Sequence, residues 1–189
     1  MTTPQVFGEE IALPATLERS LRLVFHTARL PLRWSDCSAT ANFLSAYYAG
    51  LFEAEYSAAQ TVDLTHSLAY LANELIENAV KFRAPGDVVV ETGRHGGELI
   101  LRLTNFIAPE TAGAFRALLA ELTAGDPGEL LLERIEANAA DETSSGSGLG
   151  ILTLMNDYGI RFCWTFRPAP ATDGAIHLET IARLPLPAA

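Results

Sequence analysis

Cysteine is scarce in this sequence, which contains only Cys37 and Cys163. The two lie far apart along the chain, each among apolar or aromatic neighbours. We therefore expect two buried free thiols rather than a disulfide. Free thiols persist in a reducing compartment, which makes the cytoplasm the expected location.

Basic residues and long apolar runs are also few. Thirteen Lys and Arg residues stand against 23 Asp and Glu, and the resulting net charge of −10 opposes contact with nucleic acid or an anionic membrane. No apolar run reaches about 18 residues and no charged-then-apolar leader is present, so neither membrane spanning nor secretion is expected. The four histidines show no metal-ligand spacing, so any metal is expected to arrive with a nucleotide.

The remaining composition fits one domain over residues 1–189, because 49% of the residues are hydrophobic. Apolar spacing and turn residues predict a first part with an edge strand at 6–13 and helices at about 14–30, 39–55 and 61–83. The second part is predicted to contain strands at 88–92, 99–104, 161–167 and 176–184, and helices at 109–122, 129–139 and 149–157. The expected fold class is α/β (α+β), a two-layer sandwich, with a helical N-terminal part (1–60) and an α/β core (61–187).

Four polar residues share one flank of the third predicted helix: Glu74, Glu77, Asn78 and Lys81 are spaced three and four apart. A carboxylate there can take a proton from an attacking hydroxyl, and an amide oxygen can ligate Mg²⁺ held between nucleotide phosphates. The alternative is an ordinary ion pair between Glu77 and Lys81 on a solvated face, worth about 0.2–0.5 kcal/mol.

A glycine loop precedes the last predicted helix, with Gly146, Gly148 and Gly150 at alternate positions. Backbone N–H groups at such a helix start can converge on phosphate. The spacing matches neither the phosphate-binding loop that ends in Gly-Lys-Ser/Thr nor the dinucleotide fingerprint. A flexible linker whose Ser147 caps the helix is the alternative.

Taken in order, the two motifs resemble those of the GHKL (histidine kinase-like, Bergerat) ATPase superfamily. Glu74-Leu75-Ile76-Glu77-Asn78-Ala79-Val80-Lys81-Phe82 looks like the N box, and Ser145-Gly146-Ser147-Gly148-Leu149-Gly150-Ile151 looks like the glycine box of the ATP lid. The resemblance covers about residues 61–187. It implies a Bergerat-type fold with an antiparallel or mixed sheet and an extra N-terminal helical segment. It also implies ATP and Mg²⁺ as cofactors, with Glu74 as general base, Asn78 on Mg²⁺, and Lys81 and the three glycines near phosphate.

The chain departs from that superfamily at the adenine. Where the family has Asp-x-Gly-x-Gly, this chain has Asn105-Phe106-Ile107-Ala108-Pro109. Asn105 can accept a hydrogen bond from the adenine amino group, without the charge assistance of a carboxylate. Asp173-Gly174-Ala175-Ile176 stands where a Gly-Thr is common, so the hydroxyl usually found beside adenine is expected to be absent.

By size, the chain is most similar to stand-alone anti-sigma-factor serine kinases. The resemblance implies an ATP-binding regulator of bacterial signalling that phosphorylates or sequesters a small protein, either anti-anti-sigma-like or response-regulator-like. The alternative is a degenerate GHKL fold without catalysis that uses about residues 13–56 to dock another protein or a second copy of itself. A third reading is an α/β domain in which the motif pair is accidental.

Overall fold

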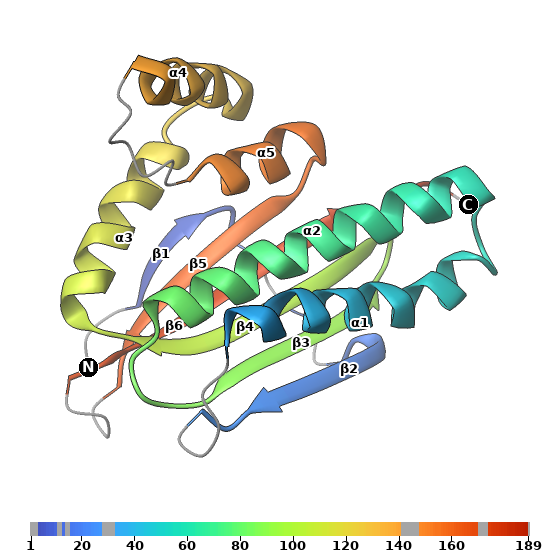
Figure 1. The fold of residues 1–189 in the computed structure, drawn as a ribbon, viewed down its shortest axis with the longest axis horizontal. Coiled ribbons are helices and arrows are strands. Elements are labelled where there is room, and N and C mark those ends of the chain that lie inside the picture. The colour runs from blue at the N-terminus through green and yellow to red at the C-terminus, as the bar shows by residue number, and fades with distance from the viewer. Residues whose placement is uncertain are drawn as a thin grey trace.

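The structure is a computed structural model, and it describes residues 4–10, 13, 16–27, 33–140, 148–169 and 174–188. Its elements, in chain order, are β1 (Gln5–Gly8), β2 (Glu18–Phe25), α1 (Trp34–Phe52), α2 (Ala58–Phe82), β3 (Val88–His95), β4 (Glu98–Ile107), α3 (Pro109–Leu122), α4 (Pro127–Ala140), α5 (Leu149–Asp157), β5 (Arg161–Pro168) and β6 (Ile176–Pro185). The expected α+β two-layer sandwich is confirmed (Figure 1).

One six-stranded sheet forms the first layer, in the order β1-β5-β6-β4-β3-β2, and all its pairings are antiparallel. The helices form the second layer (Figure 1). The main core lies between the layers and includes buried residues from α1, α2, α3, α5 and four of the strands, β3, β4, β5 and β6. The two edge strands, β1 and β2, belong to the expected N-terminal part (1–60), and the four strands between them belong to the expected core. One sheet therefore includes strands from both parts.

Helix α2 crosses the middle of this layer and carries the polar flank noted above. The side chain of its N-cap, Ser57, accepts a hydrogen bond from the Gln60 backbone N–H, and the Gln60 side-chain oxygen accepts one from the Ser57 backbone N–H, which together form a capping box. The buried face of the helix includes Leu64, Leu68, Leu71 and Leu75, at the three- and four-residue spacing of an amphipathic helix. The sequence-predicted helix is confirmed, beginning a few residues earlier than expected.

The two predicted hairpins are also confirmed, as β3–β4 and β5–β6. Two helices also agree with their predicted bounds: α3 spans 109–122 and α5 spans 149–157. Gly159 follows α5 with φ +61°, the left-handed conformation that glycine adopts most easily after a helix. Both cysteines are buried and free, as predicted.

The predicted helix over 14–30 is wrong, because residues 18–25 form strand β2. Leu21, Leu23 and Phe25 alternate with Arg22 and Val24, a period of two that suits a strand packed on one face. Pairing with β3 satisfies the backbone groups on one side of this stretch. Among the described residues of the N-terminal part, only α1 and the start of α2 are helical, and two strands, β1 and β2, are also formed.

The face of the sheet away from the helices carries a second, small apolar cluster. Ile100, Cys163 and Ile181 form its buried part, and Leu13 and Leu17 pack against it. These two leucines belong to the connection between β1 and β2, which lie at opposite edges of the sheet. Leu13 and Leu17 therefore lie against the face that the helices leave open. Within the described residues, no helix has the length and apolar character needed to cross a membrane.

Candidate nucleotide site

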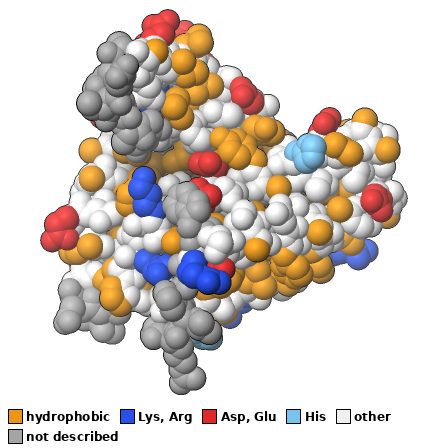
Figure 2. Space-filling view, in the orientation of Figure 1, with side chains coloured by type: hydrophobic (Ala, Val, Ile, Leu, Met, Phe, Trp, Pro, Cys, Tyr) orange, Lys and Arg blue, Asp and Glu red, His pale blue; other side chains and the backbone are white. Residues whose placement is uncertain are grey.

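A pocket of about 350 Å³ opens between α2, α3, α5 and the sheet. It lies near the lower end of the range for small-molecule sites, which is about 300–1,000 Å³. Figure 2 shows the surface hollowed in this region, with acidic side chains in the hollow. Its lining includes every described residue of the sequence-predicted site: Glu74, Asn78, Lys81, Asn105, Gly148 and Gly150. Gly146, the remaining predicted residue, lies outside the described residues.

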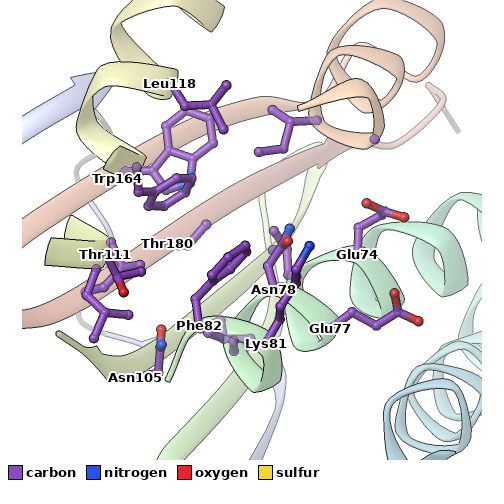
Figure 3. A pocket seen from close by; sticks show the side chains of 18 of the residues that line it. Glu74, Glu77, Asn78, Lys81, Phe82, Asn105, Thr111, Leu118, Trp164 and Thr180 are labelled. Carbon is purple, nitrogen blue, oxygen red and sulfur yellow. The ribbon is translucent and has the colours of Figure 1, made fainter. Parts of the chain in front are cut away.

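The polar flank of α2 forms one wall of the pocket (Figure 3). Glu77 accepts a hydrogen bond of 2.8 Å from the side-chain amide of Asn73. The Lys81 ammonium lies over the Phe82 ring, 5.0 Å from its centroid. Within the described part of the chain, Lys81 forms no ion pair with Glu77. The ordinary surface pair that could have explained this spacing is therefore not formed, and Lys81 remains available to an anion in the pocket.

Glu74 lies where α2 meets the first turn of α5. A Cβ at Gly150 would overlap the Glu74 carboxylate, so glycine is the residue that lets the two helices approach at this point. Burial raises the pKa of Glu74, and the neighbouring charge of Glu77 raises it further. A carboxylate with a raised pKa is a stronger proton acceptor, which suits a general base.

Asn105 lies at the other end of the pocket, on β4 (Figure 3). Asn105 is only 2% exposed to solvent. The side-chain amide nitrogen donates over a long 3.5 Å to the Phe106 carbonyl oxygen, and the buried Oδ1 has no hydrogen-bond partner in the described structure. An unpaired buried acceptor costs about 1–3 kcal/mol. A ligand that brings an N–H donor to this position would recover that cost.

The glycine loop reaches the pocket through its last residues. Gly148 is the N-cap of α5 and adopts φ +89°, in the left-handed region. A Cβ there would crowd Leu122 and Arg134, at 3.1 and 3.3 Å. The N-terminus of α5, with its unsatisfied N–H groups, therefore borders the pocket beside Glu74, where an anion is favoured.

The apolar walls were not foreseen from the sequence. They come from β4, α3, α5, β5 and β6 and include Leu103, Ile107, Phe115, Leu118, Ile151, Trp164 and Leu178. Such walls suit the faces of a flat aromatic ring. The residues that lie on strands share the helix-facing side of the sheet. Which of them are neighbours depends on the register between strands, and a sequence does not state that register.

Two hydroxyl residues in the pocket were also missed, Thr111 on α3 and Thr180 on β6. Thr180 is buried and lies on the strand adjacent to Asn105, since Asn105 is paired with Leu178. A hydroxyl on β6 therefore lines the same pocket as Asn105, although none was expected from residues 173–176. The period of two along β6 could have assigned Thr180 and Leu178 to the same face.

The chain itself offers no ready-made metal centre in the regions described, because no group of three or more His, Cys, Asp or Glu side chains is placed to hold an ion. Asn78 supplies one amide oxygen to the pocket. Mg²⁺ prefers six oxygen ligands and commonly takes most of them from phosphates and water. A metal at Asn78 would fit as a nucleotide-borne ion.

Comparison of the chain with protein-family models, with curated proteins and with solved structures finds no match.

Proposed function

We propose that this protein is a GHKL-type ATPase domain that binds Mg²⁺·ATP in the pocket and regulates a small protein partner by phosphorylating or sequestering it. The observation that carries the proposal is the meeting of the two sequence motifs and Asn105 around one pocket. These residues come from α2, β4 and the start of α5, which are far apart in sequence. If the two motifs were accidental, their residues would not be expected to line the same pocket.

The polarity of the pocket supports a nucleotide as ligand. At one end Asn105 and Thr180 stand among apolar walls, where a base could stack and its amino group could donate to Asn105. At the other end Lys81 and the N-terminus of α5 suit phosphate. Glu74 and Glu77 would repel bare phosphates there, so a divalent cation at Asn78 is needed between them.

The proposed transfer uses Glu74 as the base. A serine hydroxyl of the partner gives its proton to the Glu74 carboxylate while its oxygen forms a bond to the γ-phosphorus. The bond from that phosphorus to the β–γ bridging oxygen breaks, and ADP leaves with the released electron pair. Lys81 and the α5 N-terminus would balance the charge on the phosphoryl oxygens.

The second candidate function is a protein-docking module without catalysis. It is favoured by large apolar side chains that α1 leaves exposed, Phe43 and Tyr47. This function needs neither Glu74 nor Asn78, so substitution of those residues separates the two candidates.

The test is a pair of variants assayed for ATP binding and for phosphoryl transfer to a co-purified partner. Asn78→Ala is expected to remove the Mg²⁺-dependent part of nucleotide binding. Glu74→Ala is expected to leave ATP affinity and thermal stability close to those of the unmodified protein while lowering transfer at least about 100-fold, as for loss of a general base. Partner regulation that is unchanged in both variants would favour the docking module.

A further inference from the structure

The polar side chains at the base end of the pocket are all uncharged. They are the amide of Asn105 and the hydroxyls of Thr111 and Thr180 (Figure 3). The two carboxylates that line the described pocket, Glu74 and Glu77, lie on α2 toward the phosphate end. Among the described lining residues, therefore, every polar side chain at the base end can both donate and accept a hydrogen bond.

Asn105 is held in its present orientation by one weak contact. The side-chain nitrogen donates to the Phe106 carbonyl oxygen over 3.5 Å, which is beyond the usual range of 2.7–3.2 Å for such a bond. The buried Oδ1 has no hydrogen-bond partner in the described part of the chain. A half-turn of the amide about its last side-chain bond exchanges the oxygen and the nitrogen. That rotation gives up only the weak contact with Phe106.

The two orientations of the Asn105 amide match two kinds of purine. Adenine carries a 6-amino group, which donates, beside a ring nitrogen that accepts. Hypoxanthine and guanine carry a 6-oxo group, which accepts, beside a ring N–H that donates. With Oδ1 toward the ligand the amide accepts from a 6-amino group, and with the nitrogen toward the ligand it donates to a 6-oxo group. An ionised carboxylate at this position can do only the first, because it has no hydrogen to donate.

The remaining contacts at the base end are also indifferent to the group at position 6. The Thr180 hydroxyl can rotate to donate to one base or to accept from another. The aromatic rings of Phe115 and Trp164 supply walls on which a base can stack. Stacking tolerates a change of base, because every base presents a flat aromatic face. Most of the contact with a purine therefore does not depend on its 6-substituent.

We propose that the site accepts purine nucleoside triphosphates that carry either a 6-amino or a 6-oxo group, with the Asn105 amide turning to match each. This inference rests on the proposed function, since it requires a nucleotide in this pocket, and it extends the ligand from ATP to ITP and GTP. A polar contact that reads one base typically disfavours the wrong base by about 5- to 150-fold. Because Asn105 can present either group, we expect ITP to bind within about tenfold of ATP.

The first experiment is calorimetric titration of the whole chain with ATP and with ITP, both with Mg²⁺. ITP is the sharpest probe, because it differs from ATP only in the hydrogen-bond pattern at position 6 and the adjacent ring nitrogen, whereas GTP also adds a 2-amino group. Dissociation constants within about tenfold of each other are the expected result. ATP binding with ITP more than tenfold weaker would overturn this inference and leave the proposed function standing. If neither nucleotide binds, the proposed function fails and the inference fails with it.

The variant Asn105→Asp tests the role of the amide. At about pH 8, which favours the ionised carboxyl, this variant should weaken ITP binding relative to ATP at least tenfold, because two acceptors then face each other. Asn42→Asp is the matched control, since it makes the same change of charge at an exposed position of α1 outside the pocket lining. The control should keep the ATP to ITP ratio of the unmodified protein. An unchanged ratio in Asn105→Asp would also overturn the proposal.

A second variant does not place a charge in the core. Asn105→Leu removes both the donor and the acceptor, so the affinities for ATP and ITP should both fall at least tenfold while their ratio stays within about tenfold. Loss of ATP binding alone would show that the amide serves only the 6-amino group, which would contradict the proposal.

Discussion

Asn105 combines two properties that conflict in a protein without a ligand: nearly complete burial and an unused hydrogen-bond acceptor. A leucine at this position would remove the unpaired amide from the core. Among the described residues, it would also remove the only side-chain amide at the base end of the proposed site. Stability and ligand binding should therefore change in opposite directions when this residue is replaced.

The corresponding prediction concerns Asn105→Leu. We expect the free energy of unfolding to rise by about 1 kcal/mol, because a buried unsatisfied polar group is lost. We expect ATP affinity to fall at least tenfold, because the amino group of adenine loses its acceptor. Urea unfolding and calorimetric titration measure the two effects. A variant that binds ATP as tightly as the unmodified protein would show that Asn105 does not contact the base.

At the level of elements, the contact between α2 and α5 depends on the absence of a side chain at Gly150. The three heavy atoms nearest to a Cβ there all belong to the Glu74 carboxylate. The fold can accommodate Gly150→Ala if the Glu74 side chain moves. Glu74 would then no longer lie in the position proposed for the general base. Catalysis should be more sensitive than stability to this substitution.

We predict that Gly150→Ala lowers phosphoryl transfer at least tenfold while changing the melting temperature by no more than about 4 °C. Gly113→Ala in α3 is the matched control, since nothing lies within 4 Å of a Cβ at that helical position. This control should gain about 0.5–1 kcal/mol of stability from its better helix propensity, with unchanged transfer. Equal transfer in the two variants would argue against Glu74 as the base.

Some helices and strands can be predicted from the sequence, and others cannot. Long, strongly periodic helices such as α2 and the turn-bounded hairpins are readable because local pattern and tertiary environment agree. The stretch 18–25 is different, because Pro14 and Thr16 suggest a helix start while the alternation of Leu21, Leu23 and Phe25 suits a strand. Pairing with β3 makes this stretch a strand, and such a long-range contact cannot be predicted from the local sequence.

The same limit applies to the site. Glu74, Asn78 and Lys81 are predictable because they share one helix, and Gly148 and Gly150 because they open another. Thr180 and Trp164 enter the pocket only through the pairing of β6 with β4 and β5. Strand register of that kind is not determined by composition or spacing within a single strand.

Across the whole molecule, a line of ion pairs crosses the open face of the sheet. Arg22 and Arg102 both bind Glu91, and Arg102 and Arg167 both bind Glu179, at 2.7–3.0 Å. The line spans five strands, β2, β3, β4, β6 and β5. Burial alone would raise the pKa of Glu179, but hydrogen bonds and charges from Arg167 and Arg102 outweigh it and leave that pKa below its ordinary value.

We predict that Glu179→Gln lowers the free energy of unfolding at pH 7 by about 1–3 kcal/mol, less than the 3–5 kcal/mol typical of breaking a fully buried pair. Because the folded pKa is depressed, the native stabilisation is present above the ordinary value of 4.5 and is lost as the pH falls through the folded value. Urea unfolding of both proteins from pH 7 down to pH 3 tests this. A stability difference that stays constant over that range would show that the charge of Glu179 is not its source.

Binding of Mg²⁺·ATP in the pocket can be measured directly by calorimetric titration of the purified protein with ATP and ADP, with and without Mg²⁺. We expect micromolar binding that weakens when Mg²⁺ is removed. The absence of binding at millimolar nucleotide would contradict it.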